Sequence, residues 1–247
     1  ARGEYVYFLD SDDVPRAEAL WRLTQAAREK RLDMAKARFC FLNDETGELT
    51  DGAAICPTDV LEGGALLAAQ CQSGTYEPMV WQCVYRRAFL LENGLRMAEG
   101  LLFEDELFQA PALIRAKRAA AFDAVILEYR QRPGSIMASF AGNARWCASY
   151  AQVCARLDAL ARTLPSGAAR AALQKRVGQI ALSVGKNIPA YRLPPTVAGE
   201  AMAFLKAHRW ELARYALKSG DAAIAAQGAL LLLSPKLFVG MYRRVMP

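Results

Sequence analysis

The pattern of apolar and polar positions changes character past the middle of the chain. Residues 4–9 (EYVYFL) form an almost continuous apolar run, which is typical of a central strand that pairs in parallel. Residues 16–31 follow with apolar positions three and four apart and end in a basic cluster. This spacing predicts a helix, with Pro15 at or near its first turn.

The same two patterns alternate up to residue 132. Apolar β-rich runs predict further strands at 34–42, in the first part of 79–95 and over 120–132, and an edge-like segment between the turn at 43–48 and Pro57. Helical spacing predicts helices at 59–71, in the second part of 79–95 up to Asn93-Gly94, and at 104–119. The alternation indicates an α/β fold.

From about residue 141 the pattern is helical to the end of the chain. Ala, Leu and Arg recur at helical spacing, and breaks are expected at 165–167, at Pro189, at 194–195 and at 219–220. We therefore expect an α/β domain over residues 1–140 and an all-α region over residues 141–247.

The formal net charge of +6 hides two regions of opposite sign. Residues 1–140 carry 16 Lys and Arg against 21 Asp and Glu, whereas residues 141–247 carry 15 against 4. The basic surplus suits an anionic partner such as lipid headgroups, nucleic acid or another protein. Basic residues interleaved with aromatic stacking platforms are lacking, so we do not expect nucleic acid.

The cysteines and the histidine exclude the common zinc sites. The 6 cysteines form no C-x-x-C pair, and the one histidine, His208, lies beside Trp210 in a helical segment and is expected to be structural. The cysteines have apolar neighbours and no secretory segment precedes them, so we expect reduced thiols and a cytoplasmic location. The longest uncharged segment, residues 222–235, is too short to span a membrane.

Three carboxylates occur within four positions at the end of the first predicted strand. In open α/β sheets this edge binds ligands, and side chains two positions apart in extended backbone point the same way. Asp10 and Asp12 could therefore converge on one Mg²⁺ or Mn²⁺ ion. The alternative is that Asp12 or Asp13 caps the next helix while the other acids are solvated. A cap needs one acid and not three, which favours the metal site.

The acidic cluster does not choose a chemistry alone. Carboxylates at a strand end also serve response-regulator receivers and phosphohydrolases in which an aspartate, here Asp10, is the nucleophile. Val14 occupies the place that such phosphohydrolases fill with Thr or Val. They also need a downstream lysine and a second acidic pair, neither of which can be placed in this sequence.

Four stretches in a fixed order point to one family. They are ARGEYVYFLDSDDVP, around a D-x-D motif; VWQCVYRRAFLLENGLRM, of the type W-x-x-x-Y-R-R-x-x-L; EGLLFEDELF, with an E-D motif; and YRQRPGSIMAS, a Tyr-Arg-rich strand followed by Gly-Ser-Ile. Together they resemble family 2 glycosyltransferases, the inverting nucleotide-sugar enzymes of the GT-A fold. Four ordered matches are far more specific than one short motif.

The resemblance implies a partial GT-A fold. Residues 1–140 would be the C-terminal part of the catalytic domain, a mixed sheet flanked by helices, and residues 141–247 a helical extension. Family members begin with a strand of the type S-V-I-I-P-x-Y-N and a later D-D-G-S turn, which hold the nucleotide, and neither occurs here. By the resemblance, the chain lacks the N-terminal nucleotide-binding segment.

The resemblance also assigns roles to the acids. Asp10 and Asp12 would hold Mn²⁺ or Mg²⁺ against the diphosphate of the donor, with Asp12 as the direct ligand and Asp10 nearer the ribose or a metal-bound water. Asp13 would be the helix cap. Asp105 matches the base that removes the proton of the acceptor hydroxyl. The alternative for Asp105 is an acid that only favours the dipole at a helix start.

The other candidates carry similar alternatives. Arg130 and Arg132 share one face of a strand and would clamp the diphosphate, unless both are simply solvated. Trp81 would stack on a sugar or lie in the core, and Glu104 would orient the acceptor or cap the helix.

The basic tail has two readings. Residues 234–247 (SPKLFVGMYRRVMP) could form an interfacial helix that contacts an anionic membrane, and the alternative is packing onto the catalytic domain with a solvated basic face.

We therefore expect a metal-dependent, inverting glycosyltransferase. It would transfer a sugar from a nucleoside diphosphate sugar to a glycan or lipid-linked acceptor, in the cytoplasm or at the inner face of the membrane. The rivals are a metal-dependent phosphohydrolase with Asp10 as nucleophile and a non-catalytic scaffold that binds a membrane or a partner.

Overall fold

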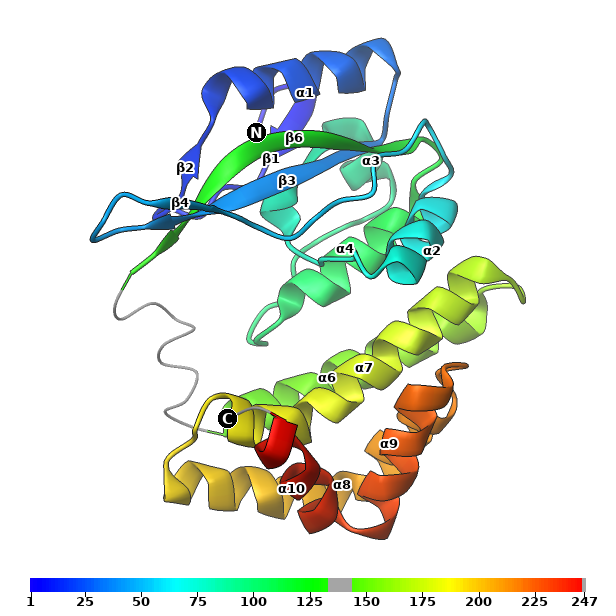
Figure 1. Cartoon of the computed structure of the whole chain (residues 1–247). Coiled ribbons are helices and arrows are strands. Elements are labelled where there is room, and N and C mark those ends of the chain that lie inside the picture. The colour runs from blue at the N-terminus through cyan, green and yellow to red at the C-terminus, as the bar shows by residue number, and fades with distance from the viewer. Residues whose placement is uncertain (133–143, 246–247) are drawn as a thin grey trace. The chain divides into compact units, whose positions relative to one another are not determined.

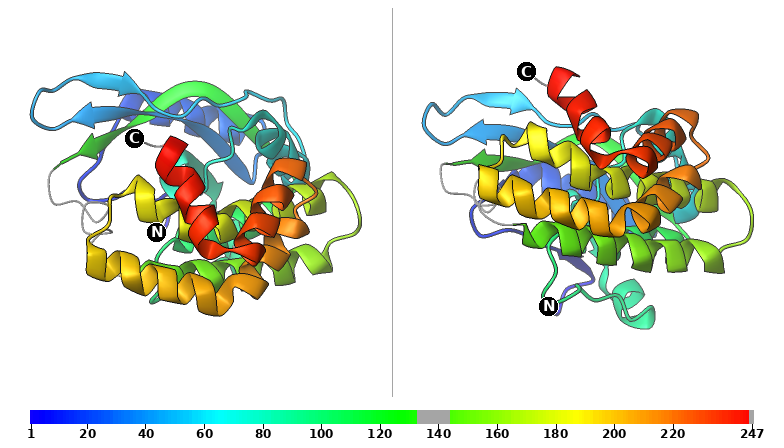
Figure 2. Two further views of the ribbon diagram at one scale, coloured as in Figure 1. Left: turned by 60° about the horizontal axis from the view of Figure 1, so that its bottom comes forward. Right: turned by 90° about the horizontal axis from the view of Figure 1, so that it is seen from below.

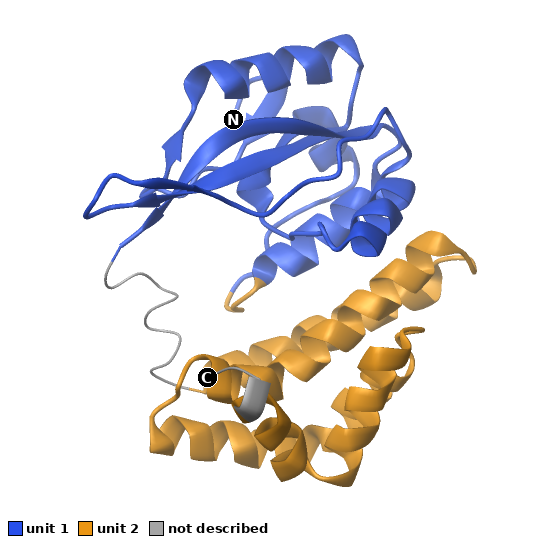
Figure 3. Cartoon of the chain, viewed as in Figure 1, with its two compact units in different colours: residues 1–99, 104–133 blue, residues 100–103, 134–247 orange. Residues whose placement is uncertain are grey.

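The chain divides into two compact units, shown in Figures 1 and 3. The computed structural model describes residues 1–132 and 144–245. The first unit, here called the sheet unit, comprises residues 1–99 and 104–133. The second, the helical unit, comprises residues 100–103 and 134–247. The short segment 100–103 thus belongs with the helices, which its sequence does not indicate.

One mixed sheet forms the centre of the sheet unit. Its strands are β1 (Tyr5–Tyr7), β2 (Val14–Pro15), β3 (Met34–Asn43), β4 (Leu49–Asp51), β5 (Cys83–Arg86) and β6 (Ala119–Gln131). The order across the sheet is β1-β5-β3-β6-β2, and β4 also pairs with β3. β3 and β6 pair in parallel and the other pairs are antiparallel. As a result β1, β3 and β6 all run in the same direction.

The core of the sheet unit lies along β3 and β6. Ala35 and Ala120 are paired in the register and are both buried. Their small side chains let the covering helices approach the sheet closely. An aromatic cluster continues this core: Phe39 meets Trp81 edge-on with ring centroids 4.9 Å apart, and Trp81 stacks on Tyr129 at 5.6 Å. Such ring pairs stabilise a core beyond the area that they bury.

Helices cover both faces of this sheet, as Figure 1 shows with α1 on one side and α2 and α4 on the other. The helices of the sheet unit are α1 (Ala17–Glu29), α2 (Gly63–Ser73), the 3-10 helix η1 (Val80–Gln82), α3 (Arg87–Glu92) and α4 (Glu104–Arg115). Leu23 and Ala27 form the buried stripe of α1. The spacing of four positions between them is the helical period that the sequence shows.

The prediction of a central, parallel first strand is wrong. β1 lies at the end of the strand order and pairs antiparallel with β5. The apolar run has another explanation: aromatic residues in β1 and directly after it contact the helices that cover the sheet. Tyr5 donates its hydroxyl to the carbonyl oxygens of Ala27 and Leu32, and the Phe8 ring meets that of Phe108 edge-on at 5.4 Å.

The remaining predictions for the sheet unit are confirmed with shifted ends. Pro15 lies in β2, and α1 begins two residues later at Ala17. α3 ends at Glu92, and Gly94 follows with a φ of 59°, the left-handed conformation that glycine adopts without strain. The stop signal at Asn93-Gly94 therefore marks the end of that helix correctly.

The helical unit is a bundle in which α7 contacts each of the other four described helices. The helices are α6 (Arg145–Thr163), α7 (Ala168–Ala190), α8 (Pro195–Leu217), α9 (Ala222–Leu233) and α10 (Pro235–Val245). Figure 2 shows α10, in red, lying across the bundle. Among the described helices, none combines the length and the hydrophobicity that crossing a membrane requires.

The predicted breaks of the helical unit are confirmed except at Pro189. Pro189 lies inside the last turn of α7, which continues to Ala190. A proline near the C-terminal end removes one backbone hydrogen bond, and few bonds remain beyond it to be disrupted. The predicted fold class, α/β followed by all-α, is confirmed.

Gly185 marks a close approach of α7 to α10. A Cβ at this position would come within 2.3 Å of the ring of Phe238 and within 3.2 Å of Leu205. Both of these side chains are fully buried, so neither can move aside into solvent. Overpacking of this kind destabilises a core by about 1 to 3 kcal/mol.

We predict that Gly185→Ala lowers the free energy of unfolding by about 1 kcal/mol or more, even though alanine favours a helix by about 1 kcal/mol over glycine. Urea unfolding followed by circular dichroism measures the change. Gly199→Ala in α8 is the control, because a Cβ there meets no atom within 4 Å. The control should be neutral or stabilising, and equal stabilisation of both variants would contradict the predicted clash.

Candidate active site

Strand direction brings polar side chains to one edge of the sheet. Because β1, β3 and β6 run in the same direction, the residues that follow each of them lie at the same end. Asp10, Asp12 and Asp13 follow β1, Asp44 follows β3, and Arg130 lies near the end of β6. We call the four aspartates the acidic edge.

Asp13 is a buried member of the acidic edge and not a helix cap. Its side chain accepts a hydrogen bond from the Arg130 backbone N–H at 2.9 Å, and its Oδ2 is buried without a hydrogen-bond partner in the described part of the chain. The N-cap residue of α1 is Arg16, which makes no side-chain capping bond. The predicted cap is therefore wrong, because β2 intervenes and pairs with β6.

Asp10 and Asp12 concentrate negative charge beside Asp13. Partial burial, and then the charge of Asp12, raise the pKa of Asp10 above its ordinary value. A turn holds the loop, since the Asp13 N–H donates to the Asp10 carbonyl oxygen at 3.2 Å. Asp12 is paired with the Arg132 guanidinium at 2.8 Å. The first two acids thus lie together, as the D-x-D spacing predicts.

Arg130 and Arg132 both lie at the acidic edge. Besides the contact of Arg132 with Asp12, the Nε of Arg130 lies 3.4 Å from a carboxylate oxygen of Asp44. Both side chains remain partly exposed, at 37% and 48%. The two arginines are therefore ion-paired at the site rather than solvated elsewhere, and their binding of a diphosphate stays a prediction.

Asp105 lies in the first turn of α4, close enough to the acidic edge to interact with it. Burial of this partly buried carboxyl, followed by the charge of Glu104, raises the pKa of Asp105 to about 7, and the charge of Asp10 contributes. A hydrogen bond from the Val80 backbone N–H opposes this shift. The structure therefore brings Asp105 to the same region of the sheet unit as Asp10.

A buried network lies behind Asp105. The hydroxyl of Tyr85 is 3.2 Å from the carbonyl oxygen of Val80 and 2.6 Å from Oε1 of Gln109, and both side chains are fully buried. Val80, whose N–H donates to Asp105, is thus held from the core side through its carbonyl group. A buried network of this kind holds a carboxyl in one position.

Trp81, Glu104 and His208 are the remaining residues that the sequence analysis discussed. Trp81 is only 5% exposed and belongs to the core that contains Phe39, so the structure favours its structural role. Glu104 precedes Asp105 in the first turn of α4 and is partly exposed. His208 stacks on Phe204 in the helical unit with ring centroids 4.1 Å apart, which supports a structural role.

Two tyrosines at the site were not predicted. Burial and the nearby charge of Asp13 raise the pKa of Tyr7, and burial followed by Asp13, Asp12 and Asp10 raises that of Tyr129. Tyr7 lies in β1 and Tyr129 in β6, two strands that run toward the acidic edge. In the sequence, only their position near the end of a predicted strand could have indicated these tyrosines, and the same holds for Asp44.

The described residues contain no group of three or more His, Cys, Asp or Glu side chains that could hold a metal ion. Asp10 and Asp12 are a pair of carboxylates at the acidic edge. Mg²⁺ is commonly held by one or two carboxylates together with substrate phosphates and water. A pair at the acidic edge is consistent with that kind of site.

Known proteins share this fold and parts of this sequence. No family model matches the chain. An uncharacterised glycosyltransferase of Escherichia coli, YibD, is 31% identical over 52% of the chain and 38% of its own length, and one of Bacillus subtilis, EpsJ, is 27% identical over 55% and 40%. The resemblance to family 2 glycosyltransferases is confirmed.

Solved structures agree with this family at the level of the fold. The chain aligns over 100% of its length with 67% of a Staphylococcus aureus TarS structure in complex with UDP-GlcNAc, with a TM-score of 0.65 and 16% identity. A TarS complex with UDP gives a TM-score of 0.63 at 17% identity. The predicted partial GT-A fold, a mixed sheet with flanking helices followed by a helical C-terminal region, is confirmed. The chain spans about 40% of the length of the curated relatives that it matches.

The raised pKa of Asp105 predicts a stability that depends on pH. The folded pKa of about 7 lies above the ordinary 3.8, so the folded state holds the proton more tightly. The stabilisation is complete below about pH 4 and is lost as the pH rises to about 7. Above that pH the folded protein carries an unfavourable charge, which Asp105→Asn removes.

We predict that Asp105→Asn raises the free energy of unfolding at pH 8 by about 2 kcal/mol, a value reduced for the solvent that reaches this carboxyl, and changes it little at pH 4. Urea unfolding at the two pH values measures the difference. Asp59→Asn, at an exposed side chain, is the control and should change stability by less than about 0.5 kcal/mol. A variant that is less stable than the wild type at pH 8 would refute the prediction.

Proposed function

We propose that the complete protein is a metal-dependent, inverting glycosyltransferase. It transfers a sugar from a nucleoside diphosphate sugar to a hydroxyl of a glycan or a lipid-linked acceptor. The observation that carries the proposal is Asp105, a half-buried carboxyl whose pKa is raised to about 7 and which interacts with Asp10 of the acidic edge. This observation stands within a fold that the chain shares with a protein solved in complex with UDP-GlcNAc.

The acidic edge fits a divalent cation in its chemistry. Three carboxylates lie within four positions, and Oδ2 of Asp13 is buried without a hydrogen-bond partner in the described part of the chain, which is costly unless a further group compensates it. Asp10 and Asp12 would hold Mn²⁺ or Mg²⁺, with Asp13 behind them. The ion, when bound, offsets negative charge on the departing diphosphate.

The arginines supply further positive charge at the same edge. Arg132 is paired with Asp12 and Arg130 with Asp44, so each guanidinium is held at the acidic edge by one carboxylate. A bound diphosphate offers each of them stronger, forked hydrogen bonds than one carboxylate oxygen does. We therefore assign to Arg132 an exchange of partners from Asp12 to the diphosphate when the donor binds.

Asp105 acts as the base for the acceptor. Its carboxylate takes the proton of the acceptor hydroxyl while the hydroxyl oxygen forms a bond to the anomeric carbon. The bond between that carbon and the diphosphate oxygen breaks, and the leaving group keeps the electron pair. A pKa of about 7 suits a base that works near neutral pH, because it is ionised in a large fraction and still basic.

Glu104 and Trp81 are the candidate residues on the acceptor side of the site. Glu104 lies next to Asp105 at the start of α4 and would orient the acceptor through its partly exposed carboxylate. Trp81 supports the site from the core, where it stacks on Tyr129. Direct stacking of Trp81 on a sugar would require its ring to leave that core.

The basic tail would place the protein at an anionic membrane surface on the cytoplasmic side. Leu233 and Leu237, at the junction of α9 and α10, are 80% and 64% exposed, and Lys236 between them is exposed as well. Large exposed apolar side chains beside basic ones are typical of interfacial contacts.

We predict that Leu233→Ser combined with Leu237→Ser weakens sedimentation of the full-length protein with phosphatidylglycerol vesicles at least fivefold. The apolar part of the contact disappears and only the screened charge attraction remains. Leu91→Ser, at a side chain that is 63% exposed in the sheet unit, is the matched control. Vesicle binding that is absent in the wild type, or equal in all variants, would exclude a membrane contact through this junction.

We predict that Asp105→Asn lowers the turnover of sugar transfer by about a hundred- to ten-thousand-fold, since the hydroxyl loses its base. The rate of the wild-type protein should fall as the pH decreases through about 7, where Asp105 takes up its proton. Asp12→Ala should abolish transfer, and added Mn²⁺ should not restore it. Release of nucleoside diphosphate from a panel of donors, with and without added Mn²⁺, measures all of these rates in the full-length protein.

Asp59→Asn serves as the control for activity and should transfer at the wild-type rate. Retention of transfer in Asp105→Asn would remove the proposed base. If a phosphate ester instead yields an aspartyl-phosphate on Asp10, the protein is a phosphohydrolase. Absence of Mn²⁺ binding, even with a nucleoside diphosphate present, would favour a non-catalytic scaffold.

A further inference from the structure

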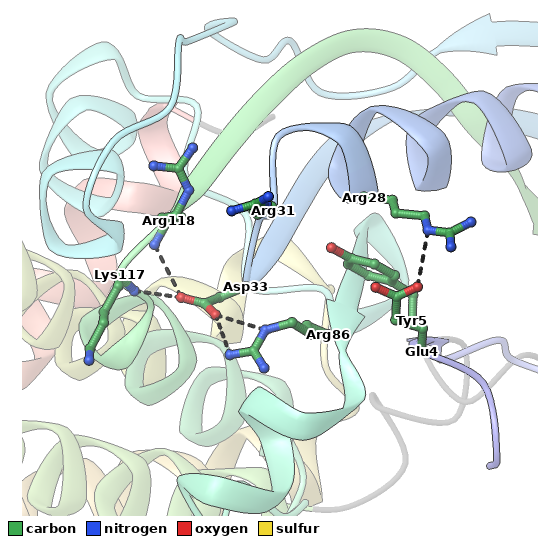
Figure 4. A pocket seen from close by; sticks show the side chains of 8 residues that line it. All are labelled: Glu4, Tyr5, Arg28, Arg31, Asp33, Arg86, Lys117 and Arg118. Carbon is green, nitrogen blue, oxygen red and sulfur yellow. Dashed lines mark hydrogen bonds and ion pairs between the residues drawn. The ribbon is translucent and has the colours of Figure 1, made fainter.

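A basic cavity lies at the opposite edge of the sheet from the acidic edge (Figure 4). Its volume is about 470 Å³, and the residues that line it are Glu4, Tyr5, Arg28, Arg31, Asp33, Arg86, Lys117 and Arg118. They come from the starts of β1, β3 and β6, from the end of β5, and from the end of α1 and the turn after it. Five of the eight side chains are cationic and two are acidic.

The acids of the cavity are already neutralised. Asp33 is only 6% exposed, and its carboxylate accepts hydrogen bonds from the Arg86 guanidinium at 2.8 Å and from the backbone N–H groups of Lys117 and Arg118 at 2.8 and 3.1 Å. Glu4 is paired with Arg28 at 3.3 Å. A carboxylate with three donors has little capacity left for the remaining cations of the cavity.

Three cations remain in surplus after these pairs, and one of them, Arg118, donates only to the uncharged carbonyl oxygen of Lys30. Neither Arg31 nor the ammonium group of Lys117 contacts a carboxylate in the described part of the chain. Figure 4 shows the Arg31 guanidinium facing the space between α1 and the side chain of Arg118. Like charges gathered in a concave surface raise the local potential and attract anions.

Arg31 lines the cavity from a backbone conformation that is strained for a residue with a side chain. Arg31 follows the end of α1 with a φ of 50°, a left-handed conformation that glycine adopts most readily. The N–H groups of Arg31 and Leu32 donate to the carbonyl oxygens of Arg28 and Ala27, which closes the helix in a Schellman motif. Glycine would satisfy this motif at lower free energy, so the backbone conformation at position 31 does not depend on the arginine side chain.

The walls of the cavity are fixed before any ligand arrives. The Arg118 guanidinium donates twice to the Lys30 carbonyl oxygen, at 3.1 and 2.9 Å, and so ties the start of β6 to the end of α1. Tyr5 ties β1 to the same turn through its hydroxyl bonds to Ala27 and Leu32. A preformed site loses little conformational entropy when it binds.

We propose that this cavity is an anion site for a phosphate-bearing small molecule, separate from the acidic edge. Arg31 and Lys117 would be its main ligands, because in the described part of the chain their charged groups have neither a carboxylate partner nor, as Arg118 has, a carbonyl partner. Forked guanidinium contacts suit phosphate oxygens, and a lysine adds a point charge. The proposal is independent of the glycosyltransferase reaction, since it rests on residues at the other end of the strands.

The test is calorimetric titration of the full chain with inorganic pyrophosphate in the presence of EDTA, which keeps the acidic edge free of cations. The double variant Arg31→Gly with Lys117→Ala should bind pyrophosphate at least a hundredfold more weakly than the wild type, about tenfold for each charge-assisted contact that is lost. Its melting temperature should not fall, because glycine fits the conformation at position 31. Arg22→Ala removes one exposed cation on α1 outside the cavity and is the matched control.

A second titration with glycerol 3-phosphate identifies the source of the phosphate. Tighter binding of pyrophosphate points to a nucleotide or another diphosphate, and tighter binding of glycerol phosphate points to a phosphomonoester or a lipid headgroup. Either result supports the site if the double variant abolishes it. The proposal is overturned if neither compound binds, or if the double variant and Arg22→Ala bind as the wild type does.

Discussion

The shared direction of β1, β3 and β6 is the constraint on which the rest of the structure depends. The parallel pairing of β3 with β6 fixes two of these strands, and the antiparallel pairs through β5 fix the third. The residues that follow β1, β3 and β6 therefore meet at the acidic edge, and residues that directly precede these strands line the basic cavity. One sheet thus carries two edges of opposite charge.

Burial and charge then compete at each edge. At the acidic edge, Asp13 is buried with one oxygen uncompensated in the described structure, and Asp105 carries a raised pKa because burial disfavours its charge. Such groups cost stability, and proteins retain them where chemistry needs them. At the other edge, Asp33 is compensated by three donors and can be structural. Within the described residues, Asp13 lacks a partner for one oxygen whereas Asp33 has three donors, and this difference distinguishes a candidate functional acid from a structural one.

Much of this arrangement could be predicted from the sequence. Period-two and helical patterns predicted nearly every element, and the D-x-D and E-D motifs predicted Asp10, Asp12 and Asp105. The errors share a cause. The apolar run at 4–9 predicts a central strand, although its aromatic residues contact helices. The position of Asp13 before a helical pattern predicts a cap, because β2 is too short to show a pattern of its own. Tyr7, Asp44 and Arg31 owe their importance to neighbours distant in sequence, which no local pattern reveals.

The central claim is that the Asp105 carboxyl is held near neutrality beside the acidic edge. Carbon-13 NMR of protein labelled at aspartate carboxyl groups measures it directly. The account predicts one resonance that titrates at about pH 7 and that is missing from the spectrum of Asp105→Asn. If every aspartate titrates below about pH 5, Asp105 is an ordinary acid at a helix start and the proposed base is contradicted.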